Sequence, residues 1–444
     1  MPTRDGAPVP DATSAQDEVV DLCRELIRID TSNYGDDSGP GERSAAEYVA
    51  AKLSEAGLDP VLKESEPGRA SVVARIEGTD SSRPALLVHG HLDVVPAHAP
   101  DWSVEPFAGE VEDGCVWGRG AVDMKDADAM VLALVRQWAR EGRRPPRDVV
   151  LAFLADEEAG GSLGAHWLVT HHPEFFEGCT EAVSEVGGFS YTLEGGPRLY
   201  LVETAQKGLA WMRLTVKGRA GHGSMVADDN AVTALCEAVA RLGRHQWPTR
   251  LTPTVQRFLE EVGDATGVEL EPDNPGESLP RLGTLARIVG ATLRNTTNPT
   301  RLTAGYKTNV IPQTAVAEVD GRFLPGYEEE FFSTVDQVLG PDVERHMLVH
   351  DRALETTYDG PLVDAMVAAL LAEDPEARVV PYCLSGGTDN KAFARLGIRG
   401  FGFMPLQLPP DLDFPAMFHG IDERVPVEAL RFGVRVLDRF LMSS

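Results

Sequence analysis

LLVHGHLDVVP, residues 86–96, is the stretch that decides the fold of this chain. Its apolar first half predicts a buried strand over residues 85–89, which is followed by the triplet His-x-Asp. Ligand sites of open α/β sheets lie outside the carboxyl ends of their strands. His91 could therefore bind a metal through its imidazole, and Asp93 could accept the other ring N–H and fix the tautomer. The alternative is a polar strand end with ordinary hydrogen bonds.

Similar elements flank this strand in the sequence. Apolar runs predict further strands over residues 71–76 and 149–154, and a helical stretch over 127–140 lies between the strand at 85–89 and the last of them. Two amphipathic helices are expected before the first strand, over residues 14–27 and 42–56. Alternation of apolar strands with helices indicates an α/β domain with a mainly parallel sheet that helices cover on both faces.

The pattern changes near Lys207. The order of the next elements is β-α-β-β-α-β, which is that of a ferredoxin-like α+β unit. These elements are expected at residues 210–216, 230–242, 292–304, 315–323, 328–339 and 343–349. The α/β pattern resumes near Leu354 and ends in a helix. We therefore expect a catalytic α/β domain formed by residues 1–206 and 352–444, interrupted by an inserted domain at 207–351.

The composition restricts the partners of this chain. It has 444 residues, with 41 Lys plus Arg against 69 Asp plus Glu and a formal net charge of −28. Nucleic acids and anionic membranes are recognised by clustered positive charge, so neither is expected as a partner. A small anionic substrate needs only one or two local cations and remains compatible with this balance.

The cysteines and the apolar runs predict the compartment. Five cysteines are present, an odd number without a CxxC pair, which favours a reducing environment over a disulfide framework. Residues 1–16 lack the apolar core of a signal peptide. The longest apolar runs, such as residues 129–135, are too short to span a bilayer. We expect a soluble, cytoplasmic protein.

Two acidic motifs extend the chemistry suggested by His91. GRGAVDMKD at residues 118–126 holds Asp123 just before a helix, where one carboxylate could bridge two metal ions, although helix capping is the commoner role for such an aspartate. ADEEAGG at residues 155–161 places three acids in a row after an apolar strand, which is costly unless a cation or solvent compensates. Glu157 could act as a general base and Glu158 as a metal ligand; a solvated acidic loop is the alternative.

Two further residues complete a possible ligand set. Glu185 follows a short apolar run, and His419 precedes the last helix; each alone is compatible with a structural role. The combined set mixes imidazole with carboxylate ligands, which suits zinc, cobalt or manganese. Its members are His91, Asp123, Glu158, Glu185 and His419. Two ions about 3.5–4 Å apart would activate a water and polarise a carbonyl, and Glu157 would pass the proton of that water to the leaving amine.

The ordered motifs HGHLDVVP, GRGAVDMKD, ADEEAGG and the late His-Gly-x-Asp-Glu resemble those of a dizinc metallopeptidase family. That family includes aminoacylase, glutamate carboxypeptidase, succinyl-diaminopimelate desuccinylase and acetylornithine deacetylase. The resemblance covers nearly the whole chain. It implies a zinc-peptidase-like catalytic domain with two Zn²⁺ per subunit, for which Co²⁺ or Mn²⁺ could substitute.

The same resemblance implies a role for each residue of the set. His91 and Glu185 would hold one zinc, Glu158 and His419 the other, and Asp123 would bridge both ions. Asp93 would orient His91, and Glu157 would be the general base. A cis peptide bond is expected between Asp123 and Met124.

The inserted segment resembles the lid domain through which this family dimerises. AGHGS at residues 220–224 matches the motif that carries a histidine, and the resemblance implies that His222 stabilises the oxyanion in the partner subunit's site. Asn309 and Arg322 match substrate-contacting positions: an amide donates hydrogen bonds, and a guanidinium can grip a carboxylate with two. Arg322 could instead be an exposed charge on a strand.

A glycine-rich loop and a long segment complete the comparison of motifs. Gly387 and Thr388 match the family's loop near the substrate, but Asn390 and Lys391 depart from the small residue or arginine of many members. Lys391 would bind a substrate carboxylate as a point charge rather than a fork. Residues 252–282 are more than a compact lid requires, and we expect them to shape the substrate entrance or the dimer.

Together these features predict a homodimeric dizinc hydrolase. It would cleave the amide bond of a small N-acyl amino acid or a short peptide, as a carboxypeptidase, aminoacylase or dipeptidase does. A dedicated N-succinyl or N-acetyl amino acid deacylase is one alternative. A non-catalytic binding protein that kept the fold is another, and it would be expected to have lost a ligand or the base.

Overall fold

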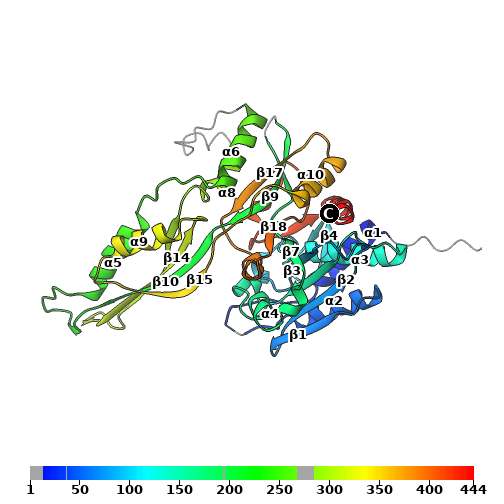
Figure 1. Ribbon diagram of the computed structural model, residues 1–444. Coiled ribbons are helices and arrows are strands. Elements are labelled where there is room, and N and C mark those ends of the chain that lie inside the picture. The colour runs from blue at the N-terminus through cyan, green and yellow to red at the C-terminus, as the bar shows by residue number, and fades with distance from the viewer. Residues whose placement is uncertain (1–13, 37, 194–195, 268–284) are drawn as a thin grey trace, which may run out of the picture. The chain divides into compact units, whose positions relative to one another are not determined.

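The computed structural model describes residues 14–36, 38–193, 196–267 and 285–444 (Figure 1). The chain divides into two compact units. Unit 1 comprises residues up to Val202, Asp359–Val379 and Ala392–Ser444, and unit 2 comprises Glu203–Tyr358 and Val380–Lys391. No helix within the described ranges is both long and apolar enough to cross a membrane.

Unit 1 contains a mixed sheet whose centre is parallel. Its strands follow the order β1-β2-β6-β3-β7-β18-β9, where β3 is parallel to β6 and β7, and β18 is parallel to β7. The strands are β1 (Val61–Glu66), β2 (Arg69–Ile76), β3 (Ala85–His91), β6 (Val149–Leu154), β7 (Cys179–Ser184), β8 (Phe189–Thr192), β9 (Arg198–Gln206) and β18 (Arg399–Gly402). The last residues of β9 and most of β17 (Arg378–Leu384), which pairs with β9, belong to unit 2. The predicted mainly parallel sheet is confirmed, and β1 and β2 form its antiparallel edge.

Helices cover both faces of this sheet. Two successive residues of β3, which point to opposite faces, contact helices on the two sides. The His89 ring lies 4.7 Å from that of Phe393 on one face. On the other face Gly90 leaves room for helix α3, because a Cβ atom there would lie 2.4 Å from Asp128 Oδ1. The helices of this unit are α1 (Ala15–Ile27), α2 (Arg43–Glu55), α3 (Lys125–Glu141), α4 (Ala165–His171), α10 (Pro361–Glu373) and α12 (Val427–Ser443), with the short α11 (Asn390–Phe393) at the boundary between the units.

The parallel arrangement sets the position of the candidate site. His91 is the last residue of β3, and it pairs with Leu154, the last residue of β6. The acids that follow β6 and β7 therefore leave the sheet at the same edge as His91. This unit also contains a small separate sheet of three strands in the order β19-β5-β4. Its strands are β4 (Glu110–Glu112), β5 (Cys115–Trp117) and β19 (Arg424–Pro426).

Unit 2 is built on an antiparallel four-stranded sheet in the order β12-β14-β10-β15. Helices α5 and α9 lie side by side on one face (Figure 1), and the residues of β10 are alternately buried and more exposed. The four strands of this sheet and these two helices follow the predicted chain order β-α-β-β-α-β. The elements are β10 (Gly208–Lys217), β11 (Gly221–His222), α5 (Ala231–Gly243), α6 (Pro253–Thr266), α8 (Leu285–Gly290), β12 (Thr296–Ala304), β13 (Val310–Ile311), β14 (Thr314–Phe323), α9 (Glu328–Leu339), β15 (Glu344–Asp351) and β16 (Leu354–Glu355).

One predicted segment of unit 2 differs from the structure, and another lies partly outside the described residues. The strand expected over residues 292–304 begins only at Thr296, because α8 precedes it and Thr292 closes the end of that helix by donating its N–H and hydroxyl to the Val289 carbonyl. The long segment 252–282 begins with α6. Its residues 268–282 lie outside the described residues, so the role expected of that segment stays a prediction.

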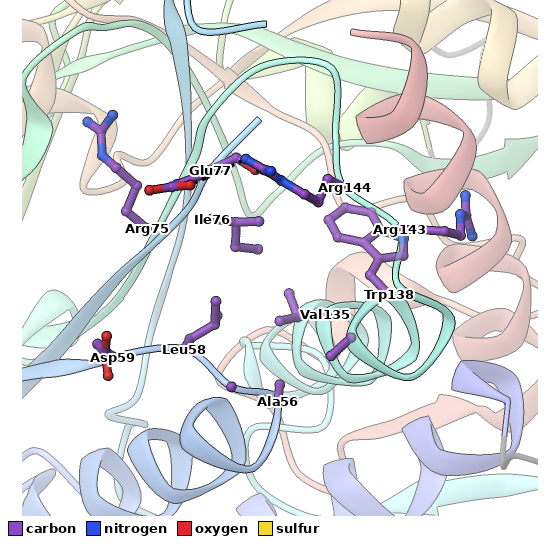
Figure 2. A pocket seen from close by; sticks show the side chains of 12 residues that line it. Ala56, Leu58, Asp59, Arg75, Ile76, Glu77, Val135, Trp138, Arg143 and Arg144 are labelled. Carbon is purple, nitrogen blue, oxygen red and sulfur yellow. Dashed lines mark hydrogen bonds and ion pairs between the residues drawn. The ribbon is translucent and has the colours of Figure 1, made fainter. Parts of the chain in front are cut away.

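Unit 1 also has a cavity of about 500 Å³, which Figure 2 shows. Leu58, Ile76, Val135 and Trp138 contribute to its lining near the carboxyl end of α3, whereas Asp123 lies just before the amino end of that helix. With a rise of about 1.5 Å per residue, the 17-residue helix α3 separates the cavity clearly from Asp123.

Candidate metal centre

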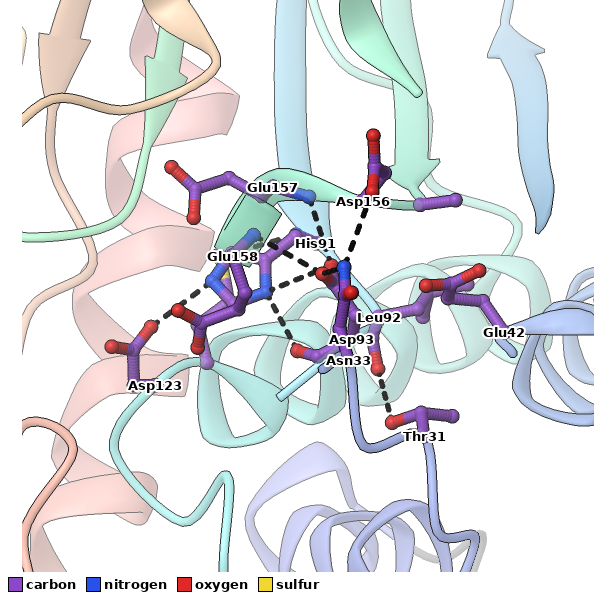
Figure 3. A network of polar contacts seen from close by, with 12 residues as sticks. Thr31, Asn33, Glu42, His91, Leu92, Asp93, Asp123, Asp156, Glu157 and Glu158 are labelled. Atoms are coloured by element: carbon purple, nitrogen blue, oxygen red, sulfur yellow. Dashed lines mark hydrogen bonds and ion pairs between the residues drawn. The ribbon is translucent and has the colours of Figure 1, made fainter. Parts of the chain in front are cut away.

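The five residues predicted as metal ligands come together in unit 1, and three of them are labelled in Figure 3. His91 Nε2 lies 3.0 Å from Asp123 Oδ1 and 3.5 Å from Glu185 Oε2. His419 Nε2 lies 3.0 Å from Glu158 Oε2 and 3.4 Å from Asp123 Oδ2. Asp123 therefore faces one histidine with each of its oxygens, as a bridging carboxylate would.

The orientation of His91 is set by the backbone. Its Nδ1 lies 2.8 Å from the carbonyl oxygen of Asp93 and 3.6 Å from the carboxylate Oδ1 of the same residue. Of these two oxygens, only the carbonyl is within hydrogen-bond distance of Nδ1. Because Nδ1–H is donated there, Nε2 is the ring nitrogen that faces the acidic cluster.

The Asp93 carboxylate instead holds the loop that carries the acids. It accepts the backbone N–H groups of Glu157 and Glu158, each at 3.1 Å, and the side-chain amide of Asn33 at 2.8 Å (Figure 3). Asn33 also donates to Asp156 at 3.2 Å. Asn33 lies in no recognised motif, and its position beside Asp93 depends on the packing of residues 31–33 against 92–94, so sequence reasoning missed it.

Glu157 opens a short 3-10 helix, Glu157–Ala159, directly after β6. One of its carboxylate oxygens belongs to a group of potential ligand atoms with His91 and Glu185, all within 4.8 Å of one another. A second such group joins His91, Asp123 and Glu158. Glu157 thus lies close enough to exchange a proton with a molecule held by this cluster.

The cluster carries more negative charge than the protein neutralises. Within the described ranges, the only cationic side chains paired with Asp123, Glu158 and Glu185 are the two histidines. Glu158 Oε1 is buried and accepts no hydrogen bond. A mixed set of imidazole and carboxylate groups with an unsatisfied buried oxygen fits a divalent cation of the zinc type.

The pKa values show the same imbalance. Burial raises the pKa of Glu158 to about 7 and also raises that of Glu185. Hydrogen bonds to Asp123 and Glu158 raise the pKa of His419 to about 10. Burial alone would lower the pKa of His91, but the carboxylates of Glu185 and Asp123 outweigh it and raise that pKa. In the absence of a metal the histidines therefore hold protons, which a divalent cation would displace.

The backbone around the ligands is unusual. The peptide bond between Asp123 and Met124 is cis, as predicted. Asp156, Val186 and His419 have φ values of 71°, 54° and 58°, in the left-handed region that residues other than glycine rarely adopt. Such conformations persist where the surrounding structure enforces them, and here each lies at a ligand or within two residues of one.

The residues predicted to contact substrate all lie in unit 2. His222 and Asn309 are neighbours, because β11 pairs with β13 and Gly223 donates its N–H to the Asn309 carbonyl at 2.9 Å. Both side chains are exposed. Arg322 is half-buried and donates two hydrogen bonds, at 2.7 and 3.1 Å, to Asp320 on the same strand.

The glycine-rich loop is tied to the start of unit 2. Thr388 is buried and exchanges hydrogen bonds with Gln206 at 2.7 and 3.0 Å. Lys391 is also buried, and its ammonium donates to the Lys207 carbonyl at 2.9 Å. Gly387 makes room for this side chain, because a Cβ atom at 387 would lie 2.4 Å from Lys391 Nζ. Their contribution to substrate binding stays a prediction.

A family model and curated relatives match this chain over most of its length. The family described as "Peptidase family M20/M25/M40" matches residues 87–443. "Probable carboxypeptidase S-like 2" of Dictyostelium discoideum is 28% identical over 387 residues, which are 81% of this chain and 71% of that protein. Human "Aminoacylase-1" is 26% identical over 430 residues, covering 95% and 94% of the two chains.

A solved structure shares the fold. The M20 family metallo-carboxypeptidase Sso-CP2 from Sulfolobus solfataricus superimposes with a TM-score of 0.74 over 96% of this chain and 99% of that one. At 19% sequence identity this likeness shows the fold alone.

Proposed function

The chain belongs to peptidase family M20/M25/M40 and is thus a hydrolytic metalloenzyme; from this membership we propose that it cleaves the amide bond of a small N-acyl amino acid or a short peptide at a two-zinc centre. The observation that carries the proposal is the pair of histidine–carboxylate groups that share Asp123. The names of the relatives, an aminoacylase and a carboxypeptidase-like protein, support an amide substrate with a free carboxylate.

His91 and Glu185 would hold one zinc, and Glu158 and His419 the other, with Asp123 shared. Co²⁺ or Mn²⁺ could take the same places, because neither imidazole nor carboxylate excludes them. When bound, the metal pair supplies a Lewis acid for the scissile carbonyl and lowers the pKa of a water.

Glu157 is the proposed general base. Its backbone N–H is fixed by the Asp93 carboxylate at 3.1 Å, so the side chain starts from a defined position at the end of β6. Its carboxylate would accept a proton from the attacking water and donate it to the leaving amine nitrogen. Asp93 would act as a positioning residue for both Glu157 and His91.

Unit 2 would supply the contacts to the organic part of the substrate. His222 would donate a hydrogen bond to the developing oxyanion. Asn309, Arg322, Gly387, Thr388 and Lys391 would contribute to binding of the substrate. We further propose that unit 2 is a lid that forms a homodimer, in which His222 serves the partner subunit.

The compartment is proposed from the cysteines. All five are free thiols, and three of them are not fully buried. Free thiols persist in a reducing compartment, which supports a location in the cytoplasm.

The test is amine release from a panel of substrates. The panel would hold N-acetyl, N-succinyl and long-chain N-acyl amino acids together with dipeptides, and ninhydrin would detect the amine. Zinc-loaded wild type would be run beside Glu157→Gln and a control, Glu66→Gln, whose side chain is exposed at the end of β1.

We expect release from at least one class, strongly reduced in Glu157→Gln and unchanged in the control. Full activity of a zinc-loaded Glu157→Gln enzyme would contradict the mechanism. Absence of release from every member by the zinc-loaded wild type would contradict the substrate class.

A further inference from the structure

A further pair of charged residues, Arg119 and Glu423, is buried beside the loop that carries Asp123. Glu423 has no exposed surface and Arg119 is 4% exposed. Arg119 Nη1 donates to Glu423 Oε2 at 2.7 Å. A buried ion pair is costly unless other hydrogen bonds satisfy its polar atoms. Arg119 Nε has no hydrogen-bond partner, whereas both oxygens of Glu423 and both terminal nitrogens of Arg119 are bonded.

Glu423 binds the loop that carries Asp123. Its Oε1 accepts the backbone N–H groups of Val122 at 2.7 Å and of Asp123 at 3.1 Å. Its Oε2 accepts the N–H of Gly120 at 3.1 Å in addition to Arg119. One carboxylate thus fixes three backbone amides of a loop whose last residue faces both histidines.

Arg119 binds the loop that carries His419. Its Nη2 donates to the carbonyl of Gly420 at 3.0 Å, directly after that histidine. The small sheet brings the two loops together, because β5 ends just before residue 118 and pairs antiparallel with β19, which begins just after Glu423. Gly118 continues this pairing by donating its N–H to the Glu423 carbonyl at 3.0 Å.

We propose that the Arg119–Glu423 pair is a positioning device that fixes Asp123 and His419 relative to each other, and that tight metal binding therefore depends on it. The inference rests on the proposed two-ion centre. Asp123 is held through its own backbone N–H, and His419 is held through the carbonyl of the next residue. Because both ligands are already in place, they lose little conformational entropy when a cation binds.

The chemistry of Glu423 provides a sharp variant. Each carboxylate oxygen of Glu423 accepts hydrogen bonds from two donors. In either orientation of its amide, Glu423→Gln therefore places an NH₂ group opposite two N–H donors. We expect this near-isosteric change to weaken zinc binding about 10–100-fold, the usual cost of losing a partner behind the ligands. Arg119→Lys is the second variant, because a single ammonium cannot reproduce the fork that joins Glu423 to Gly420.

The matched control is Glu373→Gln. The Glu373 carboxylate also accepts two guanidinium groups, from Arg435 at 2.8 Å and Arg439 at 2.6 Å, but it lies on α10 and contacts neither ligand loop. The readouts are zinc affinity by competition with a chromogenic chelator, the visible spectrum of the Co²⁺ form, and thermal unfolding of the metal-free proteins.

The expected result is weaker zinc binding and an altered Co²⁺ spectrum in Glu423→Gln and Arg119→Lys, with wild-type values in Glu373→Gln. Zinc affinity within twofold of wild type in a folded Glu423→Gln or Arg119→Lys protein would overturn the inference and leave the proposed function intact. If Glu423→Gln does not fold, Arg119→Lys alone decides. Failure of the wild type to bind any zinc would remove the proposed function and this inference with it.

Discussion

Two sets of buried charges, one in each unit, are balanced in opposite ways. In unit 1, Asp123, Glu158 and Glu185 converge on two histidines, and no lysine or arginine of the described ranges pairs with any of them. In unit 2 the buried charges include two lysines, Lys207 and Lys391, whose ammonium groups donate to the main chain. The acceptors of Lys207 are the carbonyls of Ala291 and Arg294, at 2.9 and 2.8 Å, and the hydroxyl of Thr296 at 3.1 Å.

This difference separates a ligand site from an architectural one. The acids of unit 1 leave a buried oxygen unsatisfied and keep protons on the neighbouring histidines, so their charge balance fits a bound cation. The Lys207 ammonium has an acceptor for each of its three donors, so it joins β10 to the end of α8 without any ligand. The acidic cluster therefore fits a cation-binding site, whereas Lys207 serves the architecture of unit 2.

The largest effect is expected from Asp123→Asn. An amide in place of the shared carboxylate cannot face both histidines with an acceptor, so both ions should be lost and hydrolysis with them. In the wild type, zinc at 100 times its dissociation constant should add about 2.7 kcal/mol per ion to the free energy of unfolding. Thermal unfolding with zinc and with a chelator measures this difference.

We expect the zinc-dependent shift to vanish in Asp123→Asn and to persist in Asp21→Asn, a control at an exposed position of α1. A shift of wild-type size in Asp123→Asn would remove the contrast between the units.

The next effect is expected from Glu157→Gln. This variant should keep zinc, because none of the four histidine–carboxylate contacts involves residue 157, but it should lower kcat by about 10²–10⁴-fold through loss of the general base. Steady-state kinetics beside metal analysis would show it. Loss of zinc in parallel with activity would instead identify Glu157 as a ligand, which its proximity to His91 and Glu185 allows.

A smaller loss is expected from His222→Ala, about 10²–10³-fold in kcat if this side chain donates to the oxyanion. Mixing it with inactive Glu157→Gln tests the dimer, since a mixed dimer would contain one site with Glu157 in one chain and His222 in the other. Recovery of activity on mixing is the expected outcome. No recovery between subunits that demonstrably exchange would show that His222 does not act across the dimer.

The smallest effect concerns Lys207. Burial lowers its pKa to about 7, against about 10.4 in an unfolded chain. Between these values the unfolded chain binds a proton that the folded chain lacks. Stability should therefore rise with pH, by at most about 1.4 kcal/mol per unit, relative to Lys207→Met. Urea unfolding of both proteins at pH 7, 8 and 9 measures the difference, and parallel pH profiles would contradict it.

Local chemistry allowed much of unit 1 to be predicted from the sequence. Strands such as 149–154 are short apolar runs, and polar residues that follow parallel strands must meet at one edge of the sheet. His91, Glu158 and Glu185 could be grouped on that ground. Asp123 and His419 complete that set because they add a bridging carboxylate and a second imidazole, and the resemblance to a known family implies the role of each.

Positions that depend on distant partners could not be predicted in this way. Glu423 stands in a recognisable motif, but its role depends on the pairing of β19 with β5, some 300 residues apart in sequence. The orientation of His91 by the Asp93 carbonyl depends on a turn of the backbone that side-chain types do not encode. The strand β12 starts later than expected because the turn that follows helix α8 occupies residues 291–295.

The sequence by itself thus determined the elements, the order of the ligands and the excess of acid, because these follow from side-chain periodicity and composition. Only the tertiary structure decided which acids share a histidine, which carboxylate fixes which loop, and which lysines have their hydrogen bonds satisfied by the main chain. Those outcomes depend on distances of about 3 Å between residues far apart in the chain, and hydrogen bonds of that length form only when packing brings both partners into place.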